Sequence, residues 1–269
     1  MKIAVTGWEG TIGSELVDRG YEPLKCDVTN LDEVNAEIHR VEPDVIIHCA
    51  AMTNVTWCEQ EENQQKAFSV NVNGVHNILH DFSGTLIYLS TVHVFDGKRY
   101  WDYSERHSPS PVNTYGFTKW AGEEISKFNP GRTVVIRISK LFDYAYMKPD
   151  IERLQRGEEL EFTTLIKRSF QHVSQFVDNL TWFISVMHKY PDIELLNIAG
   201  KDTFSYYDFW VKACKILGLD EKLVTPRTHK IEDTPRPFRG GLSIGKAQKI
   251  GMKAYSAVDG LKLIKQEMK

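Results

Sequence analysis

Short apolar strands and amphipathic helices alternate along residues 1–141, and this alternation constrains the fold more than any other feature of the sequence. The clearest strand is "DVIIHCAA" at 44–51, whose nearly continuous apolar run is typical of a strand buried on both faces. Further strands are predicted at 2–6, 22–26, 85–90 and 133–139, with helices at 11–19, 30–41, 60–80 and 115–128. This order predicts an α/β fold with a doubly wound, Rossmann-like parallel sheet.

The second half of the chain is less regular, which predicts a small C-terminal substrate lobe. A helix at 176–188 and the strand "ELLNIAG" at 194–200 are expected to return to the main sheet. The predicted dinucleotide-binding domain covers residues 1–142 and 173–200, and the predicted substrate-binding lobe covers residues 143–172 and 201–269. Ligands of such sheets bind beyond the carboxyl ends of the strands, where the lobe is expected to complete a substrate cleft.

Charge and composition exclude several classes of function. A net charge of −3 predicts no nucleic-acid partner and no anionic membrane surface, and no apolar run is long enough to span a bilayer. The sequence has no signal-peptide pattern and no CxxC pair, so we expect a cytoplasmic protein with reduced cysteines. His76 and His80 lack the glutamate and the third ligand of a metal site, which favours an ordinary surface helix and no metal.

The glycine-rich turn "TGWEGTIG" joins the first predicted strand to the first predicted helix. Gly7, Gly10 and Gly13 follow the spacing G-x-x-G-x-x-G, a variant of the dinucleotide-binding fingerprint. The first glycine permits a tight turn, the second admits a pyrophosphate close to the backbone, and the third lets the helix pack against the strand. Because the free N–H groups of the helix then face the phosphates, the turn predicts a bound nicotinamide dinucleotide.

Asp27 lies just past the second predicted strand, 20 residues after Gly7. An acid at this place can accept hydrogen bonds from the adenosine ribose of NADH, whereas the neighbouring Lys25 would favour the 2′-phosphate of NADPH. Asp27 can also serve as a turn residue, so both NADH and NADPH stay open as the cofactor.

Thr91, Tyr115 and Lys119 are the predicted catalytic residues. Tyr115 and Lys119 are four apart at the start of a helix, so they share one face, and Thr91 follows the strand "TLIYLS" at its carboxyl end. A lysine ammonium and an oxidised nicotinamide are expected to lower the pKa of a phenol, which is about 10 in water. In the reductive direction Tyr115 would give a proton to the carbonyl oxygen, Thr91 would polarise that oxygen, and Lys119 would also hold the nicotinamide ribose.

Six motifs together resemble the extended short-chain dehydrogenase/reductase superfamily, and within it the dTDP-4-dehydrorhamnose reductase family. They are "TGWEGTIG", "PDVIIHCAAMTNV", "VNVNGVHNI", "STVHVFDG", "PVNTYGFTKWAGE" and "RPFRGGLS". The resemblance implies an NAD(P)H-dependent oxidoreductase that reduces the 4-keto group of a nucleotide-diphosphate deoxysugar, as in dTDP-rhamnose biosynthesis. It implies a nucleotide-sugar substrate, a cytoplasmic location and a homodimer.

The resemblance also implies which residues bind the ligands. The catalytic residues are again Thr91, Tyr115 and Lys119. The implied cofactor contacts beyond Tyr115, Lys119, Gly7 and Gly13 are Gly10, Thr11, Ile12, Asp27, Val28, Ala50, Ala51 and Thr53. Arg168 in "KRSFQHVSQFV" and Arg236 in "PRPF" are implied to face the nucleotide diphosphate, which suits the two parallel donors of a guanidinium.

Departures from the family pattern lie where the sugar is expected. Val92 and His93 stand where the family has Asp-Tyr after the threonine, and we count them with Thr91, Arg168 and Arg236 as substrate-binding residues. Lys140 replaces a tryptophan typical near the substrate, and Ser174-Gln175 replaces an acidic pair. These changes leave hydride transfer in place and put the identity of the sugar in question.

Two other functions share this pattern. A nucleotide-sugar 4-epimerase uses the same three catalytic residues and retains its NAD throughout the cycle. A regulatory subunit resembling the β subunit of methionine adenosyltransferase has the same fold and binds a nicotinamide cofactor without turnover. A 4,6-dehydratase is excluded, since it needs an Asp-Glu pair where this chain has Val92-His93.

Overall fold

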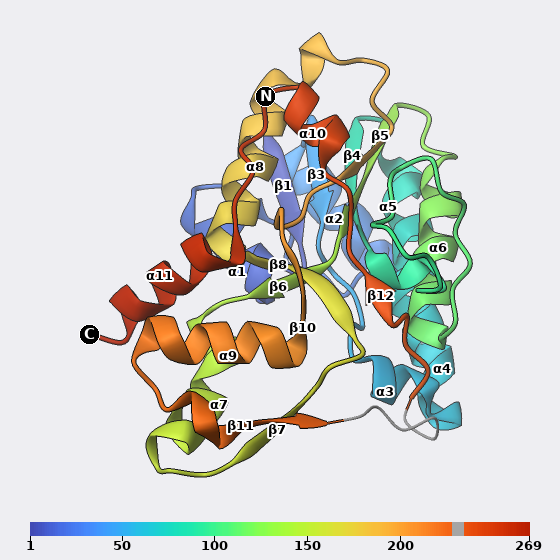
Figure 1. The fold of residues 1–269 in the computed structure, drawn as a ribbon. Helices are drawn as coiled ribbons and strands as arrows, with labels where there is room; N and C mark the ends of the chain where they lie inside the picture. Colours follow the sequence, from blue (N-terminus) through green and yellow to red (C-terminus); the bar gives the residue numbers. More distant parts are fainter. Residues whose placement is uncertain (228–233) are drawn as a thin grey trace. The chain divides into compact units, whose positions relative to one another are not determined.

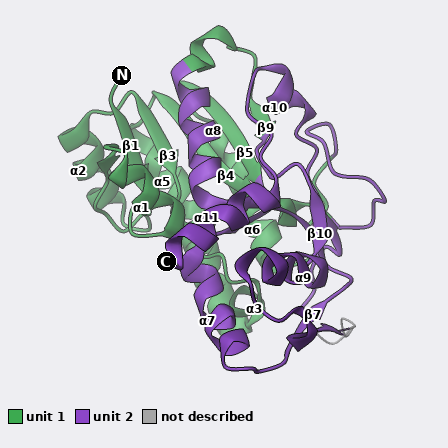
Figure 2. Cartoon of the chain, turned by 60° about the vertical axis from the view of Figure 1, so that its left-hand side comes forward, with its two compact units in different colours: residues 1–95, 108–137, 186–196 green, residues 96–107, 138–185, 197–269 purple. Residues whose placement is uncertain are grey.

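A computed structural model describes residues 1–227 and 234–269, which divide by their internal contacts into two units (Figure 2). Unit 1 comprises residues 1–95, 108–137 and 186–196, and unit 2 comprises residues 96–107, 138–185 and 197–269. This division differs from the predicted domain boundaries at three places, the first of which is residues 138–142, predicted in the dinucleotide-binding domain and found in unit 2. Residues 96–107 belong to unit 2, and of the predicted return segment 173–200 only 186–196 belongs to unit 1.

A parallel sheet forms the centre of unit 1 (Figure 1). In the described chain its strand order is β2-β1-β3-β4-β5-β9. The strands are β1 (Ile3–Thr6), β2 (Glu22–Pro23), β3 (Val45–His48), β4 (Thr85–Thr91), β5 (Arg132–Ile138) and β9 (Leu195–Asn197). The helices of this part are α1 (Thr11–Asp18), α2 (Leu31–Val41), α3 (Val55–Glu59), α4 (Glu61–Phe68), α5 (Gly74–Asp81) and α6 (Thr114–Ser126). The prediction of a Rossmann-like parallel sheet is confirmed.

Helix α2 shows how the sequence produces these elements. The side chain of Asn30 accepts hydrogen bonds from the N–H groups of Asp32 and Glu33, and its amide donates to Glu33 at 2.7 Å. The buried face of the helix carries Val34 and Ile38, which pack in one apolar cluster with residues of β1, β3, β4 and α5. The predicted N-cap and helix are therefore confirmed.

Two predicted elements of unit 1 differ from the structure. Strand β2 ends at Pro23 rather than at Cys26, because the N–H of Lys25 leaves the sheet and donates to the Glu37 carboxylate at 2.7 Å. The single helix predicted at 60–80 consists of α4, a π-helical turn at Ser69–Asn73 and α5. The extra residue of that turn changes which side chains face the sheet.

Unit 2 contains two small sheets. Strand β8 (Lys167–His172) pairs with β10 (Thr203–Ser205), β12 (Arg239–Gly240) and β6 (Lys140–Phe142), while β11 (Val224–Arg227) pairs with β7 (Leu160–Thr163). The helices are α7 (Tyr144–Gln155), α8 (Val173–Val186), α9 (Tyr206–Leu217), α10 (Gly245–Lys249) and α11 (Ala257–Glu267). Helix α8 and the short turn Met187–Lys189 after it correspond to the helix predicted at 176–188.

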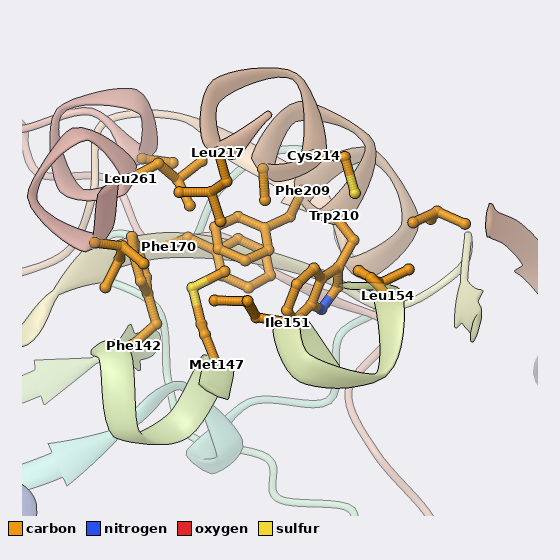
Figure 3. Close-up of a cluster of buried hydrophobic side chains, with 14 of the residues drawn as sticks. Phe142, Met147, Ile151, Leu154, Phe170, Phe209, Trp210, Cys214, Leu217 and Leu261 are labelled. Carbon is orange, nitrogen blue, oxygen red and sulfur yellow. The ribbon is translucent and has the colours of Figure 1, made fainter. Parts of the chain in front are cut away.

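An aromatic cluster forms the core of unit 2 (Figure 3). The rings of Phe170 and Phe209 stack with their centres 4.0 Å apart, and Phe142 meets Phe209 edge to face at 5.1 Å. Met147 and Ile151 of α7 fill the space beneath these rings. Among the described residues, no helix has the length and apolarity needed to cross a membrane.

Candidate active site

The glycine turn lies against the end of strand β3 in unit 1. Gly7 has a φ of +61°, and a Cβ added to it would lie 2.6 Å from the backbone N and Cα of Ala50. A Cβ on Gly13 would lie 2.2 Å from the carbonyl oxygen of Gly7. Helix α1 begins directly after Gly10, which has no capping side chain, so the first N–H groups of the helix are free to bind an anion.

A pocket of about 800 Å³ opens beside this turn. Its wall combines the glycine turn, the segments that follow β2 and β3, and one side of α4. Six predicted cofactor residues line it: Gly7, Gly10, Asp27, Val28, Ala50 and Ala51. An elongated anionic ligand such as a dinucleotide fits a pocket with this volume and a helix N-terminus at its edge.

Other predicted cofactor residues do not line this pocket. They are Thr11, Ile12, Gly13 and Thr53, together with Tyr115 and Lys119. Sequence reasoning missed the remaining wall residues, which are Trp8, Glu9, Cys26, Thr29, Cys49, Met52, Glu62, Gln65, Lys66, Ser69 and Val70. Those next to a glycine or a strand end could have been found by position. Those of α4 and the π-helical turn share one helix face, but nothing in the sequence shows which face of this helix lies at the pocket.

Asp27 is held as an ionised acceptor at the pocket wall. Its carboxylate accepts hydrogen bonds from the N–H of Thr29 at 2.9 Å and from the Thr29 hydroxyl at 2.8 Å. These bonds, backbone first, lower the pKa of Asp27. Lys25 places its ammonium 5.7 Å from the centre of the Trp8 ring, which is also part of the wall. The pocket thus offers an acid and a nearby cation to the adenosine end of a dinucleotide.

Thr91 and Tyr115 are in contact within unit 1, and Lys119 lies on the same helix as Tyr115. Thr91 is the last residue of β4, Tyr115 is in the first turn of α6, and Lys119 follows one helical turn later. All three side chains are buried. The hydroxyls of Thr91 and Tyr115 are joined by a hydrogen bond, and the Thr91 oxygen also accepts the N–H of His93 at 3.2 Å.

Burial shifts the pKa values of Tyr115 and Lys119 in opposite directions. Burial raises the pKa of Tyr115 to about 12, although the hydrogen bond with Thr91 opposes the shift. Burial also lowers the pKa of Lys119 to about 7, against the opposing effect of Glu123 and Cys49. Lys119 faces the ring of Tyr88, 4.1 Å from its centre. Desolvation is the largest effect on Tyr115 in the protein alone. The lowering of the tyrosine pKa is predicted for a site that holds an oxidised nicotinamide, and it stays a prediction.

The charge of Lys119 acts on two residues at the carboxyl end of strand β3. Its charge acts on His48, the last residue of β3, and on Cys49, which lines the pocket. His48 is held by a 2.7 Å hydrogen bond between its Nδ1 and the Thr6 hydroxyl, and its ring stacks on Tyr88 at 5.9 Å. The charge of Lys119 therefore acts on Cys49, which is one of the residues of the pocket wall.

The two residues after Thr91 have structural contacts. Val92 is fully buried and offers no surface to a substrate, in contrast to its predicted role. His93 is 8% exposed, its ring meets Tyr115 edge-on at 5.4 Å, and its Nδ1 lies 3.2 Å from the Asn113 amide. His93 therefore packs against the catalytic tyrosine.

The two arginines predicted to bind a diphosphate both belong to unit 2. Arg168 on β8 is 2% exposed, and its Nη1 donates to the carbonyl oxygens of Lys167 and Pro237, each at 2.8 Å. Burial is the main cause that lowers the pKa of Arg168 to about 10; the Tyr206 phenol opposes this shift and the charge of Arg236 adds to it.

Known proteins resemble this chain over nearly its whole length. A family model described as "RmlD substrate binding domain" matches residues 1–268. The dTDP-4-keto-6-deoxy-D-glucose reductase of Streptomyces niveus is 31% identical over 237 residues, covering 82% of this chain and 81% of that protein. A crystal structure of dTDP-4-dehydrorhamnose reductase from Bacillus anthracis in complex with NADP matches 99% of this chain and all of its own, with a TM-score of 0.87 and 25% identity.

Another relative is named as a subunit of a different enzyme and not as a reductase. The methionine adenosyltransferase 2 subunit beta of Danio rerio is 35% identical over 147 residues, which is 54% of this chain and 42% of that protein. The same subunit of Xenopus tropicalis is 27% identical over 282 residues, which is 92% of this chain and 82% of that protein. Coverage alone therefore does not separate the reductases from this subunit.

Proposed function

The chain belongs to the RmlD substrate-binding domain family, and from that premise we propose that it reduces the 4-keto group of a nucleotide-diphosphate deoxysugar with NADH or NADPH. The observation that carries the proposal is the hydrogen-bonded Thr91–Tyr115 pair with Lys119 one turn away, next to a pocket of dinucleotide size. Relatives named as reductases of dTDP-sugars support the substrate class.

Tyr115, Thr91 and Lys119 of unit 1 each have a separate role in the proposed reaction. A bound reduced nicotinamide supplies the hydride that reaches the carbonyl carbon. Tyr115 is protonated at neutral pH, so its hydroxyl can give a proton to the developing alkoxide. Thr91 holds that hydroxyl by its hydrogen bond. Lys119, one helical turn later, would supply the positive charge that stabilises the phenolate once cofactor and substrate are bound.

The remaining predicted residues bind the ligands in this proposal. The glycine turn and Asp27 hold the dinucleotide, and Arg168 and Arg236 bind the diphosphate of the nucleotide sugar. Thr11, Ile12 and Thr53 would contact the dinucleotide beyond the pocket wall. We also propose a homodimer in the cytoplasm, which gel filtration with light scattering and cell fractionation would test.

The test is NAD(P)H oxidation with a panel of dTDP-, UDP- and GDP-linked 4-keto-6-deoxysugars, for wild type and Tyr115→Phe. The exposed Tyr100 gives the matched control, Tyr100→Phe. We expect turnover with at least one sugar, loss of about two to four orders of magnitude in Tyr115→Phe, and no loss in the control. Equal rates for wild type and Tyr115→Phe would remove the assigned proton donor.

Two alternatives give different outcomes in the same assay. Cofactor binding without turnover of any sugar, together with co-purification of a partner enzyme, would indicate a regulatory subunit, as the match to methionine adenosyltransferase 2 subunit beta suggests. A cofactor that stays bound through purification and turnover without net oxidation would indicate a 4-epimerase.

A further inference from the structure

Asp27 has one carboxylate oxygen without a donor, at the wall of the pocket in unit 1. Its Oδ1 accepts both hydrogen bonds from Thr29, from the N–H at 2.9 Å and from the hydroxyl at 2.8 Å. Within residues 1–227 and 234–269, no protein donor bonds to its Oδ2. The side chain is therefore held in one orientation and keeps an acceptor for a hydroxyl of a ligand.

The backbone N–H groups around Asp27 are already bound to carboxylates. The N–H of Lys25 donates to Glu37 at 2.7 Å, and the N–H of Asp27 donates to Glu33 at 2.9 Å. The N–H of Thr29 donates to Asp27 itself. Proteins bind phosphate groups with free N–H groups and basic side chains. A phosphate beside Asp27 would find these three N–H groups occupied, and each of them occupied by a negatively charged group.

Glu33 is held in place by two donors. Its Oε2 accepts the N–H of Asp27, and its Oε1 accepts the side-chain amide of Asn30 at 2.7 Å. Asn30 also caps helix α2, which carries Glu33 in its first turn. The Glu33 carboxylate therefore stays bound to the Asp27 backbone. A phosphate beside Asp27 would meet two oriented carboxylates, and like charges brought together weaken binding.

Two lysines near the pocket offset this negative charge only in part. Lys25 places its ammonium 5.7 Å from the centre of the Trp8 ring. Lys66 of α4 is an exposed residue of the pocket wall. Hydrogen bonds from Thr29 are the main cause that lowers the pKa of Asp27, and the charge of Lys66 contributes least to that shift. Exposed ammonium groups are strongly hydrated and are screened by salt, whereas the carboxylate of Asp27 is oriented at the wall.

We infer that the segment after β2 selects NADH over NADPH, and that Asp27 and Glu33 determine this selectivity. The inference rests on the proposed function for the dinucleotide as the ligand. The 2′-hydroxyl of NADH would donate to the free oxygen of Asp27. NADPH carries a phosphate monoester at this position, with about two negative charges at pH 7.5. That phosphate would lie beside the Asp27 carboxylate with no free N–H in the segment and with Glu33 behind it.

The two residues have separable effects. Asp27 both accepts the hydroxyl of NADH and repels the phosphate of NADPH, so its charge acts on both affinities. Glu33 has no free oxygen for a ligand, because both of its oxygens have donors within the protein. Its charge therefore acts on the phosphate of NADPH and has little effect on NADH.

The experiment measures the dissociation constants of NADH and NADPH by fluorescence titration at pH 7.5 and fixed ionic strength. We expect wild type to bind NADH at least about tenfold more tightly than NADPH. Asp27→Asn keeps the shape of the side chain and removes its charge, so it should weaken NADH binding, strengthen NADPH binding and bring the ratio towards one. Glu33→Gln keeps an acceptor for the N–H of Asp27, and should strengthen NADPH binding several-fold while leaving NADH binding nearly unchanged.

The matched control is Asp32→Asn, which removes the same charge from an exposed side chain in the first turn of α2. It should leave the ratio of the two affinities unchanged, and thermal melts verify that each variant is folded. Equal affinities of wild type for NADH and NADPH would overturn the inference, as would a preference for NADPH. An unchanged ratio in both Asp27→Asn and Glu33→Gln would also overturn it.

Turnover of a 4-keto sugar with each cofactor is measured in parallel, so that the selectivity and the proposed reaction are tested separately. Turnover by a wild type that binds NADH and NADPH equally well overturns only the selectivity. The expected preference for NADH without turnover of any sugar overturns only the reductase.

Discussion

Lys119 places its ammonium 4.1 Å from the centre of the Tyr88 ring, on the strand that ends in Thr91. The hydroxyl of Tyr88 donates in turn to the carbonyl oxygen of Lys119 at 3.2 Å. This double contact fixes helix α6 against strand β4, so the positions of Thr91, Tyr115 and Lys119 relative to one another follow from the packing of two regular elements.

Replacing Lys119 by methionine should abolish the fall of kcat/KM above pH 7. Burial sets the pKa of Lys119 at about 7, so the charged form is lost as the pH rises through 7. If the charge is needed, kcat/KM for NAD(P)H, which reports the free enzyme, should fall above pH 7 in wild type. Lys119→Met should be slower below pH 7 and show no such fall. A fall of the same size in Lys119→Met would assign the titration to another group.

Removing the Thr91 hydroxyl should slow turnover without changing substrate binding greatly. Thr91→Val keeps the shape of the side chain and removes the hydrogen bond with Tyr115, whose pKa that bond lowers. We expect kcat to fall roughly a hundredfold with a small change in KM. Thr91→Ser retains the hydroxyl and should recover most of the rate. Steady-state kinetics of wild type and the two variants measure kcat and KM. A wild-type kcat in Thr91→Val would exclude a role for the hydroxyl.

The ion pair between Glu123 and Arg137 should be important for stability. Both side chains are almost fully buried, with Arg137 Nε 2.9 Å from Glu123 Oε1 and Nη2 2.6 Å from Oε2. The Ser90 hydroxyl adds a 2.5 Å bond to the same carboxylate. Arg137→Met leaves a buried carboxylate without its cation, and should lower the free energy of unfolding by about 3–5 kcal/mol.

The exposed pair Lys127–Glu124 on the same helix is the control for this change. Lys127→Met should cost under about 1 kcal/mol, because solvent screens that pair. The double variant Glu123→Leu with Arg137→Met removes both buried charges and should recover part of the loss. Urea denaturation measures all three, and equal losses for Arg137→Met and Lys127→Met would contradict the account.

Adding one methyl group to the glycine turn should disturb the dinucleotide site. A Cβ on Gly13 would lie 2.2 Å from the carbonyl oxygen of Gly7, so helix and turn must move apart. We expect Gly13→Ala to lower stability by more than about 1 kcal/mol and to weaken NAD(P)H binding. Gly245→Ala is the control, since the nearest atom to its added Cβ is 3.8 Å away. Fluorescence titration measures the affinity of both variants for NAD(P)H. Equal affinities of Gly13→Ala and Gly245→Ala would contradict the packing argument.

The first 141 residues could be predicted well because their fold follows from local patterns. The strand "DVIIHCAA" and the Asn30 cap each identify an element without knowledge of its neighbours, and β3 and α2 appear where they indicate. The π-helical turn at Ser69–Asn73 has no such local pattern, so the sequence predicted one unbroken helix there. The wall residues Glu62, Gln65, Lys66, Ser69 and Val70 were missed because the sequence does not show which face of the helix lies at the pocket.

Spacing predicted that Tyr115 and Lys119 share one helix, but it could not predict their pKa values. Spacing places Lys119 one turn after Tyr115, and the structure agrees. The direction of the Tyr115 pKa depends on burial by residues distant in sequence, and the sequence does not reveal that Lys119 faces Tyr88. Likewise, Val92 was expected to face a substrate because it departs from the pattern of the resembling family at the sugar site, whereas it is buried within unit 1.

The most direct test of the central claim follows deuterium from the cofactor to the sugar. NAD(P)H carrying deuterium at the nicotinamide C4 is incubated with a nucleotide-linked 4-keto-6-deoxysugar and either wild type or Tyr115→Phe, and the product is analysed by mass spectrometry and NMR. The account predicts deuterium at C4 of the reduced sugar with wild type, and almost none in the same time with Tyr115→Phe. Product without deuterium, or equal labelling by both proteins, would contradict it.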